Sequence, residues 1–468
     1  MEFKSMGNLF PTAWPTVRIT ADARSNRGPM AGTSCRQEAS GSFRTSTTGA
    51  STADTSAQFV APSFDIACVH CGCFLQQCLS HSASRLMLAG LTSAIAWSGH
   101  LATIPFSLVA WALMYKAKSR FQAYVMLFSY YLGASWPLIP GARAFFGART
   151  SILSGILLYL TATILLAVPA ALLFNGNRAR RLLAIPAMLI LSALPPLGII
   201  GWASPLLSAG VLFPGTCWLG LICVLGIVAL AGRFPWQTAA LAGVLALIAH
   251  ALYKPSALPP DWQAMNTEFG GAGQGDPDFL AEFDAHEQMQ ETIRGSHARL
   301  LLFPEDVVTE WNVATEAFWR ESLQASARHD TTVLIGAGIQ QGRRPNAPGT
   351  MRYYNVLIAR GAETRAIYYQ RIPVPIGMWK PLSEDGVPLN VFGKGTIDIQ
   401  HARAAVLLCY EQLLVWPFVS SAIEHPTVLI TAANDYWVKQ TPILEIQRAS
   451  ARSFARLFGL PLLSAVNQ

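Results

Sequence analysis

The sequence predicts a protein of two parts, a polytopic α-helical membrane domain followed by an α/β domain. Of its 468 residues, 52% are hydrophobic and only 13% are charged, whereas ordinary soluble domains are about 25% charged. Long apolar segments fill residues 85–253, and short apolar runs alternate with helical stretches over 254–468. The long segments are typical of membrane spans, and the alternation is typical of an α/β domain.

Residues 1–84 precede both parts and are rich in Ser, Thr, Ala and Gly, with little apolar periodicity. Such a composition cannot bury a core, so we expect these residues to be disordered. Alternatively, translation begins near Met87, at the start of the first apolar segment. Four cysteines and a histidine cluster within eleven residues of this extension: Cys68, His70, Cys71, Cys73 and Cys78. A structural zinc site needs ligand pairs separated by a longer loop, so we expect no metal and no cofactor.

Seven apolar segments follow, separated by short loops that carry basic residues, Gly or Pro. They lie at 86–98, 102–114, 121–139, 151–174, 182–201, 213–231 and 236–252. Because a bilayer span needs about 20 helical residues, the first two form either a helical hairpin or one longer span kinked at Pro105. Pro195 and Pro196 lie in the fifth segment and are expected to kink it.

Loop charge predicts the orientation of these spans. Three loops are rich in cations, with Lys116, Lys118 and Arg120 in the first, Arg178, Arg180 and Arg181 in the second, and Arg233 in the third. They alternate with poorer loops at 141–150 and 203–212. The positive-inside rule places the rich loops in the cytoplasm of a bacterial inner membrane and the C-terminal domain in the periplasm. Because the basic residues are spread through loops, direct nucleic-acid binding is not expected, despite a net charge of +7.

Six short apolar runs in residues 254–468 are predicted to be strands: ARLLLF, TVLIGAGI, YNVLIA, AIYYQ, AAVLLC and TVLITAAN. Helices are predicted around 279–293, 309–325 and 445–458. The runs NVLIAR and TRAIYYQ, joined by Gly361-Ala362-Glu363, are predicted to form a β-hairpin.

Three of these runs end in residues with reactive or polar side chains. AAVLLC ends at Cys409, LLFPE ends at Glu305, and AIYYQR carries Gln370 and Arg371. Taken singly, a buried cysteine is more often an inert small hydrophobe, and a glutamate before a helix is favoured by the helix dipole. Together, a thiol and a carboxylate within reach provide a nucleophile and a general base.

The ordered segments LLFPE, YYQRIPVPIGMWKPL, LLCYE and TAANDYW resemble the nitrilase superfamily of carbon–nitrogen hydrolases. With the multi-span N-terminal half, the chain is similar to the apolipoprotein N-acyltransferases. Residues 86–468 also resemble a family of conjugal-transfer proteins of rhizobial and Ti-type plasmids. The resemblance implies an αββα sandwich, Glu305 as general base, and Cys409 as a nucleophile that forms a thioester. It further implies that Glu411 supports the site, and that Tyr410, Asn434 and Trp437 bind substrate, with the N–H after Cys409 serving the oxyanion.

Two departures stand against this resemblance. Gln370 occupies the position of the family's lysine, and a neutral amide cannot lower a thiol pKa as a cation does. Arg371 is expected to face away because strand neighbours alternate, and Lys380 lies beyond the following turn. The sequence also ends at AVNQ, where the family fold would continue, so we expect an incomplete C-terminus.

The sequence therefore predicts a membrane-anchored thiol acyltransferase or amidase that acts at the periplasmic face on a membrane lipid, acyl or amide substrate. The conjugal-transfer resemblance adds the conjugation machinery as a partner. The alternative is a catalytically impaired relative that binds lipid or peptide as a conjugation accessory.

Overall fold

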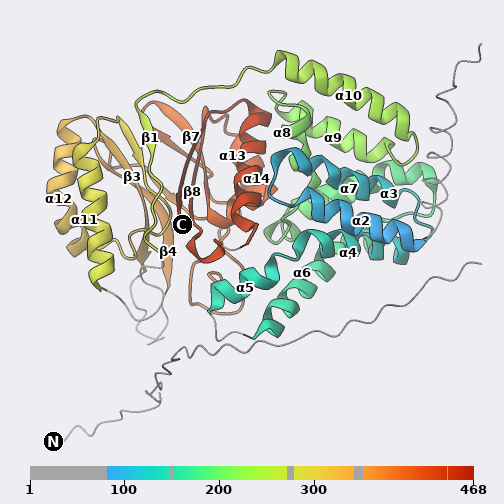
Figure 1. Ribbon diagram of the computed structural model, residues 1–468, viewed down its shortest axis with the longest axis horizontal. Coiled ribbons are helices and arrows are strands. Elements are labelled where there is room, and N and C mark those ends of the chain that lie inside the picture. Colours follow the sequence, from blue (N-terminus) through green and yellow to red (C-terminus); the bar gives the residue numbers. More distant parts are fainter. Residues whose placement is uncertain (1–81, 148–150, 271–278, 342–351, 440) are drawn as a thin grey trace, which may run out of the picture. The chain divides into compact units, whose positions relative to one another are not determined.

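A computed structural model of the chain describes residues 82–147, 151–270, 279–341, 352–439 and 441–468. The cysteine cluster between 68 and 78, and nearly all of the extension predicted to be disordered, lie outside the described residues. A helical half comes first and an α/β domain follows it (Figure 1).

The helical half consists of short and medium helices joined by tight turns. Side chains of Ser119, Ser151 and Asn177 accept hydrogen bonds from the first turns of α4, α6 and α7, which fixes where these helices begin. The elements are α2 (Ser82–Ala96), η1 (Leu101–Phe106), α3 (Ser107–Met114), α4 (Arg120–Ser135), α5 (Leu138–Phe146), α6 (Ile152–Leu173), α7 (Arg178–Ala193), η2 (Leu197–Ile199), η3 (Pro205–Leu207), α8 (Ser208–Leu212), α9 (Trp218–Leu230) and α10 (Pro235–Leu252).

Two of the described helices are long and apolar enough to cross a membrane. They are α6, with 22 residues and a mean hydropathy of 2.4, and α10, with 18 residues and a mean hydropathy of 1.4. The continuous η1–α3 unit and α9 are apolar but shorter. Each predicted segment thus overlaps a helix, but among the described residues length and composition support only two of the seven spans.

Prolines explain where the predicted helix boundaries were wrong. The helix α7 ends at Ala193, so Pro195 and Pro196 follow it instead of kinking it. The predicted span 121–139 is divided between α4 and α5, and α5 begins in the segment Pro137–Pro140, where the first helical turn needs no N–H donors. The predicted loop 203–212 contains η3 and α8, because Pro205 at a first helical position is capped by Ser204.

The α/β domain contains two sheets, ordered β1-β2-β3-β4-β5 and β6-β7-β8-β9. All six predicted strands are present, and the predicted hairpin is the antiparallel pair β4–β5. Three strands were not predicted: β1, β6 and β9. The elements are β1 (Trp262–Ala264), α11 (Phe279–Gly295), β2 (Leu300–Leu302), α12 (Val313–Arg328), β3 (Thr332–Gln340), β4 (Tyr353–Gly361), β5 (Ile367–Tyr369), β6 (Thr396–Ile399), β7 (Ala402–Leu408), η4 (Cys409–Leu413), α13 (Val415–Ala422), β8 (Val428–Asn434), η5 (Tyr436–Val438), α14 (Ile443–Phe458) and β9 (Leu462–Asn467).

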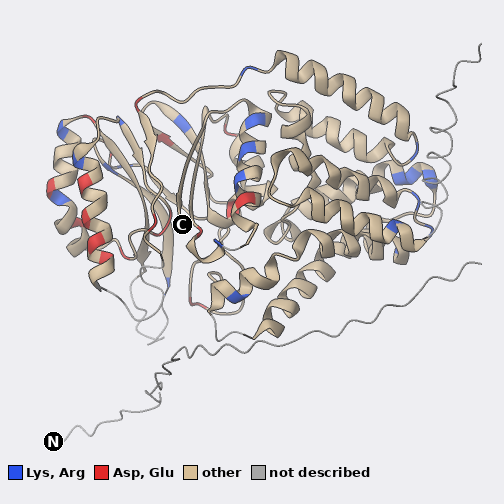
Figure 2. Cartoon of the chain, in the orientation of Figure 1, with Lys and Arg blue, Asp and Glu red and all other residues tan. Residues whose placement is uncertain are grey.

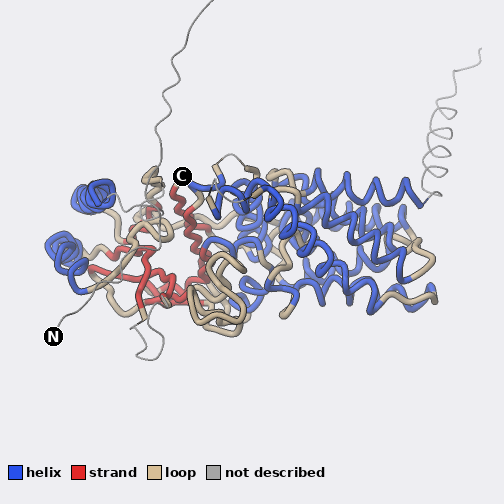
Figure 3. Tube along the Cα trace, turned by 90° about the horizontal axis from the view of Figure 1, so that it is seen from below, coloured by secondary structure: helices blue, strands red, loops and turns tan. Residues whose placement is uncertain are grey.

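Apolar side chains place the two sheets face to face. Leu302 and Leu357 of the first sheet share one buried cluster with Val406 and Ile430 of the second. The other face of the first sheet packs in a cluster that includes Trp319 of α12, and α13 and α14 pack on the other face of the second. Figure 3 shows the strands lying between these helices. The layer order is α-β-β-α, as the resemblance implied.

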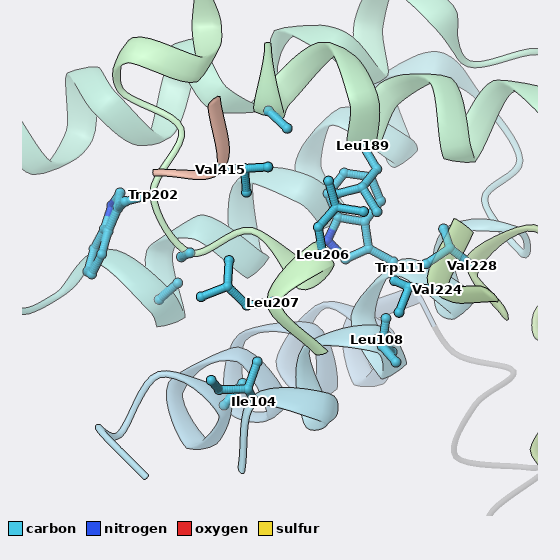
Figure 4. Close-up of a cluster of buried hydrophobic side chains, with 14 of the residues drawn as sticks. Ile104, Leu108, Trp111, Leu189, Trp202, Leu206, Leu207, Val224, Val228 and Val415 are labelled. Atoms are coloured by element: carbon cyan, nitrogen blue, oxygen red, sulfur yellow. The ribbon is translucent and has the colours of Figure 1, made fainter. Parts of the chain in front are cut away.

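The helices α13 and α14 also contact the helical half. Val415 of α13 lies in one buried cluster with Leu206 and Leu207, as Figure 4 shows. The Tyr410 hydroxyl donates to the Ile199 carbonyl at 3.0 Å. The Ser453 hydroxyl of α14 donates to the Leu207 carbonyl. The second sheet, α13, α14 and the helical half therefore share a continuous core.

Candidate active site at Cys409

The thiol lies at a sharp turn from strand to helix. Cys409 is the first residue of η4, directly after β7, and its side chain is buried. Its φ of +45° lies in the left-handed region, which is strained for a residue with a Cβ. Residues held in such conformations concentrate at functional sites, so this turn marks Cys409 as a candidate functional residue.

Glu305 approaches the thiol from the other sheet. It lies just after β2, and its side chain is only 3% exposed. Its carboxyl group accepts hydrogen bonds from Asn355 Nδ2 at 2.5 Å and from the Asn434 backbone N–H at 3.0 Å. Its carboxyl group also acts on the Cys409 thiol and raises the pKa of that thiol. The ends of β2, β7 and β8 therefore bring the predicted base, the predicted nucleophile and Asn434 together.

Gln370 lies in this same polar group, where the family resemblance places a lysine. Asn355 Nδ2 donates to Gln370 Oε1 at 3.0 Å, so one amide bridges Gln370 and Glu305. Gln370 Nε2 donates to the Leu408 carbonyl at 3.3 Å, one residue before the thiol. The predicted site position is therefore occupied by an amide that contributes hydrogen bonds but no charge.

Neither candidate cation replaces the lysine. Arg371 faces away, as expected, and its guanidinium donates to the Tyr368 hydroxyl at 2.9 Å and to the Pro417 carbonyl at 3.0 Å. Lys380 is exposed. Among the described residues, the charged groups that act on the Cys409 thiol are the carboxylates of Glu305 and Asp435.

Glu411 is fully buried and holds the turn in place. Its carboxylate lies 3.6 Å from Arg371 Nε. Its donors come from both sides of the turn: Tyr368 Oη at 2.7 Å, and the backbone N–H groups of Arg371, Ile372 and Leu408 at 2.8, 3.1 and 3.0 Å. These contacts tie the segment after β5 to the end of β7, so Glu411 orients Cys409 through the backbone.

Burial is the largest influence on the pKa values of the site, and no cation is among the described groups that shift the pKa of Glu305 or of the Cys409 thiol. Burial raises the pKa of Glu305 to about 8, although its interactions with Cys409 and Asn355 oppose the shift. Burial raises the pKa of Asp435 to about 7. Both Asp435 carboxyl oxygens lack a hydrogen-bond partner among the described residues. Burial, followed by these carboxylates, raises the pKa of the Cys409 thiol well above its usual value. Near neutral pH the thiol is therefore protonated. The pKa of Glu305 lies slightly above neutral pH, so Glu305 can both accept and release a proton there.

An apolar cavity of about 120 Å³ opens beside the thiol. Tyr410 and Trp437, both predicted to bind substrate, line it together with Cys409. Gln447 of α14 also lines it and donates to the Cys409 carbonyl at 2.9 Å. The remaining wall comes from both halves of the chain: Leu138, Leu158, Ala162, Ile200, Trp202, Val374, Pro375, Leu413 and Ile443.

Sequence reasoning missed several residues of this site. Asn355 is the one polar side chain inside the apolar run YNVLIA, and that signal was available. Asp435 lies between the predicted residues Asn434 and Trp437. The helical wall around Trp202 and Leu158 carries no sequence signal, because apolar residues within apolar segments look alike.

The chain was compared with known proteins. No known family profile matches it. It is 31% identical over 397 residues to the probable conjugal transfer protein TraB of Sinorhizobium fredii, covering 83% of this chain and 99% of that protein. It is 30% identical over 406 residues to the conjugal transfer protein TraB of Agrobacterium fabrum, covering 82% and 92%. The chain belongs to the TraB family.

Two further similarities concern parts of this TraB-family chain. It is 26% identical over 235 residues to the apolipoprotein N-acyltransferase of Azotobacter vinelandii, covering 47% of this chain and 43% of that enzyme. A carbon–nitrogen hydrolase of Helicobacter pylori superposes with a TM-score of 0.30 at 13% identity, covering 43% and 72%. The acyltransferase similarity agrees with the nitrilase-like motifs.

Proposed function

We propose that this TraB-family chain is a membrane-embedded, thiol-dependent acyltransferase or amidase that serves plasmid conjugal transfer. One arrangement carries the proposal: Cys409 on a strained turn, beside Glu305 and in the wall of an apolar cavity. A purely structural role gives no reason to combine a strained thiol, a buried base and an empty apolar space.

The proposed reaction has two steps. Cys409 Sγ attacks the carbonyl carbon of an acyl ester or amide while Glu305 takes the thiol proton, and the Tyr410 N–H stabilises the oxyanion. The tetrahedral intermediate expels an alcohol or amine, which takes the proton from Glu305 and leaves a thioester. An acceptor amine or water then attacks the thioester and gives its proton to Glu305. Cleavage of the C–S bond releases Cys409, which takes that proton back.

The surroundings of the cavity support a lipid acyl chain as the group transferred. Leu138 of α5 and Leu158 of α6 form part of its wall, so an acyl chain can enter from the side of the apolar helices. Leu252 and Trp236 of α10 are 75% and 83% exposed, which suits contact with lipid better than contact with water. A membrane location of the helical half is therefore part of the proposal.

Mass spectrometry of the full chain after incubation with phospholipid vesicles tests the chemistry. We expect a hydroxylamine-labile acyl adduct on Cys409 that is absent in Cys409→Ala and retained in Cys223→Ala, a control thiol in α9. An adduct that persists in Cys409→Ala, or no adduct in the unaltered chain, would contradict the proposal.

Labelling with a membrane-impermeant maleimide tests the proposed orientation. Lys254 and Lys118 are both exposed. The predicted topology puts Lys254 on the periplasmic side of the membrane and Lys118 in a cytoplasmic loop. In intact cells we expect Lys254→Cys to react, and Lys118→Cys to react only after permeabilisation. The reverse pattern would place the C-terminal domain in the cytoplasm.

A second candidate is a conjugation accessory that binds lipid or peptide without chemistry. It is favoured by Gln370 at the lysine position and by the raised pKa of the Cys409 thiol. Conjugation assays separate the two functions. If Cys409→Ala transfers plasmids at the normal frequency while Ala162→Phe, which fills the cavity, does not, binding alone is the function.

A further inference from the structure

A second apolar space lies between α9 and α10. Two adjoining cavities, of about 440 and 300 Å³, share Phe213, Cys223 and Leu245, and we call them together the α9–α10 groove. Its walls include Gly226 and Ile227 of α9 and Leu241 and Ile248 of α10. The combined space is within the range of small-molecule sites.

This groove is separate from the cavity at Cys409. The two spaces share no lining residue among the described part of the chain. The helix α14 reaches both, with Ile443 and Gln447 at the Cys409 cavity and Gly459, just after the helix, at the groove. At 1.5 Å per helical residue, Gly459 lies about 18 Å from Gln447 and about 24 Å from Ile443.

Basic side chains gather at one end of the groove. Lys254 and Tyr253 line this end. The Arg456 guanidinium lies 5.4 Å from the centre of the Tyr253 ring, and its Nη2 is 3.5 Å from His250 Nε2. The sequence contains no Asp or Glu from residue 66 to residue 260, and Figure 2 shows no acidic residue on α8, α9 or α10. An anion at this end therefore meets cations without a competing acidic side chain from these helices.

We propose that the α9–α10 groove binds one phospholipid, with its acyl chains between the two helices and its phosphate against Lys254 and Arg456. Apolar walls leading to a cationic end complement a lipid with an anionic headgroup. The inference rests on the proposed membrane location of the helical half, but it does not depend on chemistry at Cys409.

Paired glycine substitutions test the acyl-chain part of the site. A Cβ added at Gly226 or at Gly243 meets no atom within 4 Å, so neither substitution strains its helix. Of these two glycines, only Gly226 lines the groove. Native mass spectrometry of the detergent-purified full chain, titrated with phosphatidylglycerol, is expected to show one tightly bound lipid. Gly226→Leu should lose that lipid and Gly243→Leu should keep it. Equal binding by the two variants would overturn the proposal.

Headgroup recognition is tested with Lys254→Gln and, as a matched control, Lys118→Gln, since both lysines are exposed. The loss of one charge-assisted contact to phosphate should weaken phosphatidylglycerol binding about tenfold for Lys254→Gln. Diacylglycerol, which has no phosphate, should bind the two variants equally. Equal phosphatidylglycerol binding by the two variants would contradict a phosphate contact at Lys254.

Cys409→Ala separates this inference from the proposed chemistry. The variant should lose the acyl adduct but retain the groove lipid. Loss of the lipid together with the adduct would mean that a single site explains both signals, and would overturn a separate lipid site.

Discussion

Gln370 leaves the candidate site without a charge at the position where the family resemblance places a lysine. Two neutral amide side chains, Gln370 and Asn355, are linked by a hydrogen bond, and Asn355 donates a second one to Glu305. Because both groups are buried, Glu305 and the Cys409 thiol hold their protons more tightly than usual. The site is therefore expected to be slow near neutral pH and faster in alkaline conditions.

Gln370→Lys should increase the rate of thioester formation by about 10–10². In the unaltered chain the rate should rise with pH through about 8, where Glu305 becomes the carboxylate that serves as base. A lysine ammonium nearby favours the carboxylate, so the same rise should occur at lower pH in the variant. Single-turnover acylation measured across pH checks both expectations. An unchanged pH profile would show that residue 370 does not act on Glu305.

Asp435→Asn should stabilise the protein, and more so in alkali. The folded-state pKa of Asp435 is raised from 3.8 to about 7. Its contribution to stability is therefore fully present below 3.8, and it is lost as pH rises through about 7. Removing the carboxylate should gain no more than about 4 kcal/mol, the equivalent of the whole shift.

The stability gain for Asp435→Asn is checked by unfolding midpoints at about pH 8 and about pH 4, where linkage predicts a large and a small difference. Asp398→Asn is the control, because Asp398 is 64% exposed in its ion pair with Arg403. A gain at acid pH that equals the gain at alkaline pH would contradict the titration of Asp435.

At the scale of elements, one buried polar network joins β5, η4 and α13. Glu411 accepts from the Tyr368 hydroxyl and from the Arg371 backbone, and the Arg371 side chain donates to Ser420 at 3.0 Å and to Ser421 at 3.1 Å on α13. The network fixes the turn at Cys409 relative to both sheets. The buried arginine therefore acts in the architecture of the site and makes no contact with the thiol.

Arg371→Met should lower the free energy of unfolding by about 3–5 kcal/mol, since it leaves the Glu411 carboxylate buried without its counter-ion. Arg403→Met removes a pair whose two side chains are at least half exposed, and should cost less than about 1 kcal/mol. Chemical denaturation of the detergent-purified variants measures both. Similar losses in the two variants would mean that burial of the pair does not matter.

At the scale of the whole described chain, the candidate site requires both halves. Its cavity is lined by Trp202 and Leu158 from the helical half and by Trp437 and Cys409 from the α/β domain. Gly210 of α8 allows the halves to approach, because a Cβ there would collide with the Ser453 carbonyl oxygen of α14. The helical half therefore forms part of the site.

Gly210→Ala should lower the unfolding midpoint, with a cost of about 1–3 kcal/mol for overpacking, and should also reduce acylation of Cys409. Gly243→Ala, at a position with no atom within 4 Å of the added Cβ, should do neither. Scanning fluorimetry and the thioester assay check the pair. Full acylation by Gly210→Ala would show that the contact between α8 and α14 is not needed.

The sequence by itself predicted the division into two halves, the strands with strong apolar runs, and the motif residues Glu305, Gln370 and Cys409. Local sequence patterns are enough to predict these features, because the periodicity of apolar residues and the residue type at the end of a strand are properties of short segments. Strands β1, β6 and β9 were not predicted, because a polar residue (Gln263, Asp398 and Ser464, respectively) interrupts each apolar run. Only the tertiary structure brought Asn355 between Glu305 and Gln370, turned Arg371 toward Glu411, and closed the Cys409 cavity with helical side chains. Those outcomes depend on how distant segments pack, and burial in that packing sets the proton affinities of the site.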